Sequence, residues 1–103
     1  MGLTIDRTDP CINEIRSDGQ QECYLVLSDE ERAKGFVRPV RKKYTHVKCG
    51  TLTIMGSAIA ETYARNPTFY GGTYCVGCKT HFDLMVDGIR QFFWDGTTEG
   101  VGT

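Results

Sequence analysis

The chain has 103 residues, of which 40% are hydrophobic and 24% are charged, and its formal net charge at pH 7 is −1. This length predicts one domain with one core, and the near-average composition excludes a disordered chain and a membrane-spanning protein. The neutral balance excludes binding to nucleic acid through overall charge, so any such binding must be local. Asp6 and Asp9 interrupt the apolar run that a signal peptide needs, so we expect a soluble, cytoplasmic protein.

The first third of the chain predicts two short elements after an irregular start. Residues 1–21 show no sustained periodicity, so we expect a weakly structured N-terminal arm, followed by a single domain over 22–103. The apolar run 22–27 is typical of a short buried strand. Ser28 begins an S-x-x-E capping box, which predicts a brief helix over 29–34.

The clearest helix of the sequence lies in the middle of the chain. From Met55 to Tyr63, the residues of one face recur at spacings of three and four. Pro67 ends the pattern, because proline cannot continue the hydrogen-bond ladder and disfavours helical geometry in the residue before it. We therefore expect a helix over 54–65.

Aromatic residues mark the later strands. The runs 69–75 and 89–94 are rich in aromatic residues and bounded by glycines, so we expect a strand in each. The segment 96–103 contains three glycines, which predicts a loose tail. The aromatic side chains are either core or candidates for a partner surface or a homodimer contact, and they are Phe69, Tyr70, Tyr74, Phe92, Phe93 and Trp94.

Two pairs of metal-ligating side chains share one spacing. Cys75 and Cys78 form a C-x2-C pair, and His46 and Cys49 repeat that spacing with an imidazole in place of the first thiol. Each spacing allows a tight turn to point both side chains at one ion, and Gly50 permits the backbone of such a turn. The mixed set favours zinc, and four protein ligands leave no position for a catalytic water. We therefore predict a structural Zn²⁺ site.

The fourth ligand has an alternative. His81 follows Cys78 at the same spacing and replaces His46 if three ligands come from one turn. We prefer His46, because two paired turns approach the ion symmetrically. For Cys11 and Cys23 the alternatives are a place in the metal shell or a disulfide with each other, but a cytosolic setting favours free thiols.

The sequence contains no familiar catalytic motif. It has no Gly-rich phosphate loop, no G-x-S-x-G and no H-E-x-x-H. A redox dithiol needs a helix after its C-x-x-C to lower the thiol pKa, and the segment 79–87 has no helix cap. Asp83 and Asp87 are not spaced to hold two ions beside His81. We expect a non-enzymatic protein, with a metal-dependent or dithiol enzyme as the lesser alternative.

The segment from His46 to His81 carries several further motifs, namely KCG, MGxAxAETYARNPxFYG, YCVGC and HF. Together with LSDEERAKGFVRPVR before them and WDGT…VGT after them, they resemble small zinc-binding proteins of phages and prophages, a family with no assigned activity. The resemblance implies phage origin, a place in the host cytosol and zinc binding, but no reaction. It assigns Cys49, Cys75 and Cys78 as ligands and has histidines at both remaining positions.

The charge pattern indicates a contact surface. Segment 32–48 has seven basic residues and no acidic ones. A small phage protein without catalytic machinery typically binds a macromolecule, so we expect a protein-binding module that inhibits or modulates a host enzyme or defence complex. The alternative is a zinc knuckle that binds nucleic acid through phosphate contacts and a stacked tyrosine. The candidate contact residues are Arg38, Arg41, Lys42, Lys43, Tyr44 and Lys48.

These predictions combine into one fold class. We expect a small α+β domain of the zinc-ribbon or treble-clef type, with strands near 22–27, 69–75 and 89–94 packed on the 54–65 helix. The assembly is expected to be a monomer or a homodimer.

Overall fold

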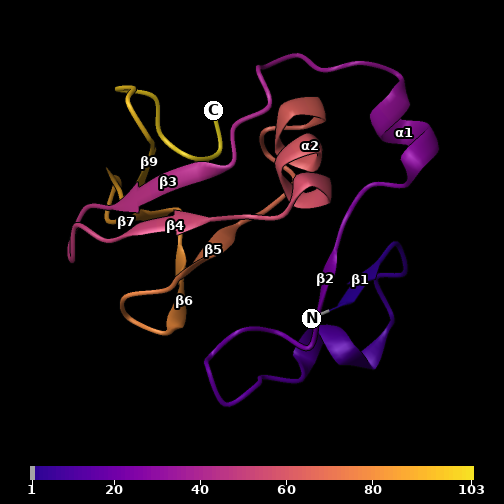
Figure 1. Cartoon of the computed structure of the whole chain (residues 1–103), viewed down its shortest axis with the longest axis horizontal. Coiled ribbons are helices and arrows are strands. Elements are labelled where there is room, and N and C mark those ends of the chain that lie inside the picture. Colours follow the sequence, from indigo (N-terminus) through magenta and orange to yellow (C-terminus); the bar gives the residue numbers. More distant parts are fainter. Residues whose placement is uncertain (1) are drawn as a thin grey trace.

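The computed structural model describes residues 2–103 (Figure 1). Within this range the strands form four small sheets of two or three strands each, next to two α-helices. The fold is therefore a mixed α+β arrangement, as predicted. In chain order the elements are β1 (Gly2–Thr4), the 3-10 helix η1 (Pro10–Asn13), β2 (Cys23–Leu25), α1 (Asp29–Ala33), β3 (Lys43–His46), β4 (Leu52–Ile54), α2 (Ser57–Arg65), β5 (Gly72–Cys75), β6 (Thr80–Asp83), β7 (Met85–Val86), β8 (Ile89–Arg90) and β9 (Phe92–Trp94).

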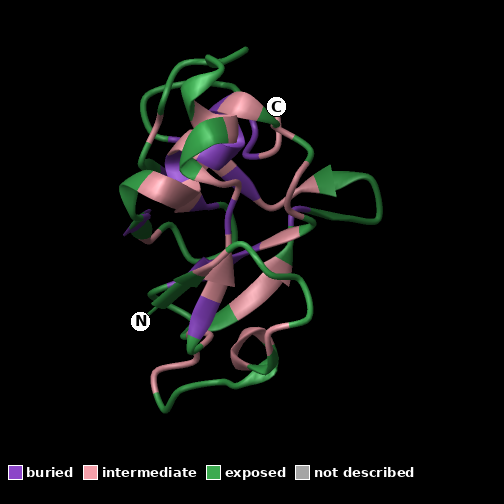
Figure 2. Cartoon of the chain, turned by 90° about the vertical axis from the view of Figure 1, so that its right-hand side faces the viewer, coloured by how far each residue is buried: buried purple, intermediate pink, exposed green. Residues whose placement is uncertain are grey.

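The core lies between the central sheet and α2. This sheet has the order β4-β3-β9, with antiparallel neighbours. Tyr44 on β3 and Trp94 on β9 are direct cross-strand partners, and each is only 2% exposed. Tyr63 of α2 meets the Trp94 ring edge to face, with centroids 5.5 Å apart. Figure 2 shows the buried residues concentrated around α2 and the neighbouring strands, whereas the N-terminal segment is mostly exposed or half-buried.

The first helix forms as its capping box predicts. Ser28 Oγ accepts a hydrogen bond from the Glu31 N–H at 3.2 Å, and Gly35 follows the helix with a φ of +111°. Arg32 then joins α1 to α2 through an ion pair with Glu61 at 2.6 Å. The short helix is therefore stabilised by tertiary contact as well as by its cap.

The second helix begins later than expected. Its end at Arg65 agrees with the predicted stop at Asn66 and Pro67. Its start at Ser57 differs from the predicted 54, because Leu52–Ile54 forms β4 instead. Backbone pairing with β3 therefore determines the secondary structure of this segment and overrides the helical spacing of its apolar residues.

The predicted strands are present in shortened form. β2 lies inside 22–27, β5 occupies the end of 69–75, and β8 and β9 divide the run 89–94. β1, β3, β4, β6 and β7 lie in segments where we expected no strand. Because these strands have two to four residues, their sequences carry little periodicity.

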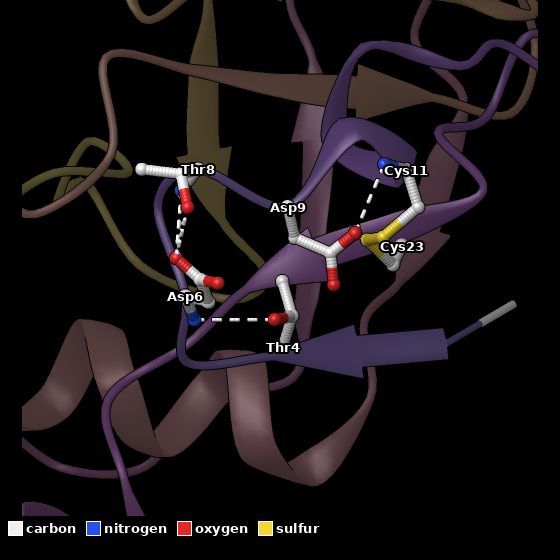
Figure 3. Close-up of a disulfide and its surroundings, with 6 residues drawn as sticks. All are labelled: Thr4, Asp6, Thr8, Asp9, Cys11 and Cys23. Atoms are coloured by element: carbon white, nitrogen blue, oxygen red, sulfur yellow. Dashed lines mark hydrogen bonds between the residues drawn. A yellow bond between two sulfur atoms is a disulfide. The ribbon is translucent and has the colours of Figure 1, made fainter.

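The segment expected to be a weakly structured arm contains regular structure. β1 pairs in parallel with β2, and a disulfide joins Cys11 of η1 to Cys23 of β2 (Figure 3). The expectation of free thiols at these positions is therefore wrong. The two Cα atoms are 5.4 Å apart, which is within the range that a disulfide spans. Asp9 caps η1 by accepting a hydrogen bond from the Cys11 N–H at 3.1 Å.

The C-terminal segment is also held in place, so the prediction of a loose tail is wrong. Val101 is 1% exposed, and its N–H donates to the Phe92 carbonyl at 3.0 Å. Arg41 donates to the Thr103 carbonyl at 2.7 Å. A single buried valine between glycines gives no periodic signal, which explains why the sequence did not reveal this contact.

Candidate metal centre

Four potential ligand side chains from two turns converge at one point. His46 and Cys49 belong to the turn between β3 and β4, and Cys75 and Cys78 belong to the turn between β5 and β6. One ligand atom from each residue lies within 4.8 Å of all the others. The His46 Nδ1 atom is 3.4 Å from Cys49 Sγ and 3.7 Å from Cys78 Sγ, and Cys49 Sγ is 3.4 Å from Cys75 Sγ. The group is close enough to bind a metal ion.

The two turns share one backbone conformation. The Gly50 N–H donates to the His46 carbonyl at 2.7 Å, and the Lys79 N–H donates to the Cys75 carbonyl at 2.8 Å. Gly50 has a φ of +70° and Lys79 a φ of +55°, so the residue after the second ligand is left-handed in both turns. Glycine satisfies this requirement in the first turn, whereas a lysine adopts the same conformation in the second.

Gly77 allows the second turn to approach the first closely. A Cβ atom at this position would lie 2.4 Å from Thr51 Oγ1 and 2.8 Å from Thr51 Cβ. Any larger residue would therefore push the two turns apart and separate the ligand pairs. Sequence analysis did not single out Gly77 or Thr51, because their contact is between segments distant in the chain.

His46 is fixed by packing. The residue is 0% exposed, and the centroid of its ring lies 4.6 Å from that of Phe82 and 4.7 Å from that of Phe92. Its Nε2 atom is buried and has no hydrogen-bond partner among residues 2–103. The two phenylalanines thus orient the imidazole so that Nδ1 faces the sulfur atoms. Phe92 lies in the predicted aromatic run 89–94 and Phe82 in the HF motif, but the sequence did not connect either ring to His46.

The environment shifts the thiol pKa values of the centre in opposite directions. Hydrogen bonds from the Thr51 hydroxyl and backbone N–H lower the pKa of Cys49 to about 6. Desolvation, followed by the neighbouring sulfur atoms, raises the pKa of Cys78 to about 11. Cys49 therefore becomes a thiolate more readily than Cys78, and a bound cation would favour the thiolate form of its cysteine ligands.

His81 lies outside this group. Its Nε2 atom is 3.0 Å from the Tyr24 hydroxyl, and its ring centroid is 5.3 Å from that of Tyr74. Burial lowers the pKa of His81 below its ordinary value. The structure thus places His46 with the three cysteines, whereas His81 connects β6 to the N-terminal segment.

The fold leaves four of the six predicted contact residues exposed and buries or pairs the other two. Arg38, Lys42, Lys43 and Lys48 are exposed. Arg41 lies 4.6 Å above the Trp94 ring, and its side chain is 13% exposed and paired with Glu99 at 3.2 Å. Tyr44 is buried, and its hydroxyl donates to the Tyr74 carbonyl. The prediction that Tyr44 stacks on a base is wrong, and Arg41 is engaged within the chain, because both residues belong to the central sheet and its packing.

A second cluster of ligand-type residues has another role. Asp9, Cys11 and Cys23 also lie within reach of one ion. The two sulfur atoms are bonded to each other, and the Asp9 carboxylate caps η1. This cluster is therefore a disulfide with its neighbouring cap.

No protein-family model, curated protein or solved structure matches the sequence. Among residues 2–103, no helix combines the length and the apolar character needed to cross a membrane. Function must therefore be inferred from the site and the surface.

Proposed function

We propose that the centre holds a structural Zn²⁺ ion and that the chain is a non-enzymatic, zinc-stabilised binding module related to the zinc-ribbon type. With Zn–S bonds of about 2.3 Å and Zn–N bonds of about 2.0 Å, the ligand atoms of a tetrahedron are about 3.5–3.8 Å apart. The separations of 3.4, 3.4 and 3.7 Å in the centre are close to these values. Three sulfurs and one imidazole are also a common structural zinc set.

Two observations support a structural role for the ion. Four protein ligands complete a tetrahedron, so no position is left for a reacting water. A redox dithiol gains its reactive thiolate from a following helix, but Cys78 is followed by Lys79 and then by β6. Both observations favour a module that binds over one that catalyses.

The binding role is carried by one face of the central sheet. Side chains alternate along β3, so Lys43 and Thr45 point away from the core, and Val47 continues this pattern because its N–H donates to the Gln91 carbonyl at 2.9 Å. Their cross-strand partners on β4 and β9 share the same side. We call this the outer sheet face, and its members are Lys43, Thr45, Val47, Leu52, Ile54 and Phe93.

The outer sheet face is open and largely apolar. Val47 is 55% exposed, Leu52 is 42% exposed and Ile54 is 65% exposed, so residues 2–103 leave a large part of each of these residues open to solvent. Lys42 and Lys48 are exposed next to the face in sequence. Apolar side chains bordered by lysines fit a protein partner with an apolar patch and an acidic rim.

A protein partner is favoured over nucleic acid for this surface. Tyr44, the aromatic residue predicted to stack on a base, is buried, and the exposed Phe36 is not part of the outer sheet face. Arg41, Arg32 and Lys34 are paired with acidic side chains of the chain itself, which reduces the free positive charge. Phage origin and a host enzyme or defence complex as the target belong to this proposal through the sequence resemblance.

Affinity capture with a matched pair of variants tests this role. Leu52→Asp places a charge on the outer sheet face, and Met85→Asp places the same charge on β7, where the original side chain is 47% exposed. We expect the wild type and Met85→Asp to capture the same protein from bacterial lysate and Leu52→Asp to lose it, with circular dichroism showing that both variants are folded. Equal capture by both variants, or no capture by the wild type, contradicts the proposal.

The same preparation tests the alternative. Binding of mixed oligonucleotides that weakens by orders of magnitude between about 50 and 200 mM salt would favour nucleic acid as the partner. We expect no such binding at the lower salt concentration.

A further inference from the structure

A pocket of about 200 Å³ lies where the N-terminal segment meets the core. Ile12, Gln21 and Leu25 contribute one wall, and residues of β4, α2, β5 and β6 contribute the rest. All five tyrosines of the chain line this pocket, which we call the tyrosine pocket, and they are Tyr24, Tyr44, Tyr63, Tyr70 and Tyr74. Its lining, within the described chain, includes no Asp, Glu, Lys or Arg.

Four of the five tyrosine hydroxyls already have hydrogen-bond partners. These partners are the Tyr74 carbonyl for Tyr44, the Leu25 carbonyl for Tyr70, the Asp18 carbonyl for Tyr74 and the His81 imidazole for Tyr24. The Tyr63 hydroxyl is buried and forms no hydrogen bond of normal geometry in the part of the chain that the structure describes, although the Thr73 hydroxyl lies close enough to influence its pKa. A buried hydroxyl without a partner is unfavourable, so this group is ready to bind a polar atom that enters the pocket.

The tyrosine pocket and the outer sheet face lie mainly on opposite sides of the central sheet, and Ile54 is the one member of the outer sheet face that also lines the pocket. Tyr44 and Thr53 line the pocket and are buried. Their sequence neighbours Thr45 and Leu52 belong to the outer sheet face, and side chains of successive strand residues point to opposite sides. A molecule in the pocket would therefore contact mainly the side of the sheet opposite to the proposed protein surface, with Ile54 at the border between the two.

We propose that the tyrosine pocket binds a small, uncharged aromatic molecule whose single polar group forms a hydrogen bond with the Tyr63 hydroxyl. A cavity of about 150 Å³ holds benzene, so the volume of about 200 Å³ accommodates one ring or a fused pair of rings. Aromatic walls favour a planar ring through edge-to-face and offset contacts.

The lining also selects against charge. An ionised ligand would lose its hydration without gaining an opposite charge, which is costly in a buried site. His81 is the one titratable side chain of the lining besides the tyrosines, and its burial lowers its pKa, so the lining is neutral near pH 7. Both features favour a neutral aromatic ring over a carboxylate or an amine.

Titration of the purified, metal-containing protein with simple probes tests the proposal. Indole is a neutral bicyclic ring with one N–H group, and benzoate and benzylammonium are charged rings of similar size. We expect saturable amide chemical-shift changes with indole, with a Kd on the order of 1 mM or tighter, at pocket residues such as Gln21, Leu25 and Thr73. The charged probes should bind at least about 10-fold more weakly.

Tyr63→Phe removes the free hydroxyl and keeps the ring. We expect it to weaken indole binding about 3- to 10-fold, the equivalent of one hydrogen bond, and to leave the binding of toluene unchanged. Ile89→Ala, on the exposed β7–β8 hairpin, should change neither. The proposal is overturned if indole does not bind saturably, if its shifts lie on the outer sheet face away from Ile54, if benzoate binds equally well, or if Tyr63→Phe binds indole as the wild type does.

Discussion

Replacement of each histidine by phenylalanine should separate the metal centre from ordinary packing. His46 is 0% exposed and lies between Phe82 and Phe92, so a phenylalanine would fill the same space and extend the aromatic stack. The change also removes a buried Nε2 that has no partner within residues 2–103, a defect that costs about 1–3 kcal/mol. Packing alone therefore predicts that His46→Phe is neutral or stabilising.

The metal centre predicts the opposite sign. A structural zinc site contributes about 10–16 kcal/mol of apparent free energy, so an equal share for each of four ligands is about 2.5–4 kcal/mol. A domain of this size has a free energy of unfolding of about 5–15 kcal/mol. Loss of the His46 ligand should therefore remove a large part of the stability even though the core is filled.

His81→Phe is the matched control. His81 lies beside Tyr24 and Tyr74, outside the four-ligand group, so this variant should keep one metal ion per chain. Native mass spectrometry gives the metal content, and urea unfolding gives the free energy for both variants. The reasoning is refuted if His46→Phe retains stoichiometric metal, if His81→Phe alone loses it, or if the wild type unfolds identically after exhaustive chelation.

Three further perturbations follow from the packing. Replacing Cys11 and Cys23 together by serine opens the disulfide, whose sequence separation is 12, and should lower the free energy of unfolding by about 3 kcal/mol in urea titrations; an unchanged midpoint would contradict the cross-link. Val101→Ala should cost about 1–3 kcal/mol because the side chain is 1% exposed, whereas exposed Thr98→Ala should stay within about 0.5 kcal/mol, and equal thermal midpoints would show that the tail is not packed. Gly19→Ala would place a Cβ 1.8 Å from the Lys79 carbonyl at a φ of +87°, so amide hydrogen exchange should rise throughout residues 10–21; unchanged protection would exclude this contact.

Local signals predicted the start of α1 and the end of α2, whereas pairing between distant segments determined most of the strands and delayed the start of α2. The Ser28 cap and the Asn66–Pro67 stop act within one or two turns of the chain, so their effects were visible in the sequence. β3 lies inside the basic segment, and its partner β9 is about fifty residues further along the chain. Strands of three or four residues depend on such partners, which a single sequence does not reveal.

The candidate site shows the same division. The spacing of each ligand pair is a property of one tight turn, so the sequence could indicate the two pairs. Packing against Phe82 and Phe92 places His46 with the cysteines in preference to His81. These two rings come from different sheets. The burial of Tyr44 likewise follows from its pairing with Trp94. Tertiary packing therefore decides which chemically suitable residues are available for binding.

The disulfide and the candidate metal centre lie in different parts of the molecule. The disulfide links η1 to β2, whereas the four candidate ligands come from the β3–β4 turn and the β5–β6 turn. The N-terminal segment meets the core through the Gly19–Lys79 approach and the Tyr24–His81 contact, and the tyrosine pocket lies at this junction.

Opening the disulfide should therefore affect the pocket and spare the metal centre. In the double serine variant, Ile12 of the pocket wall is no longer held to β2 by the neighbouring disulfide, and we expect the four candidate ligands to keep their positions. A smaller fraction of the molecules then has the pocket wall in the conformation that binds indole. The affinity for indole should fall in proportion to that fraction. Native mass spectrometry should still find one metal ion per chain. Loss of the ion together with indole binding would show that the two cross-links support a single cooperative unit.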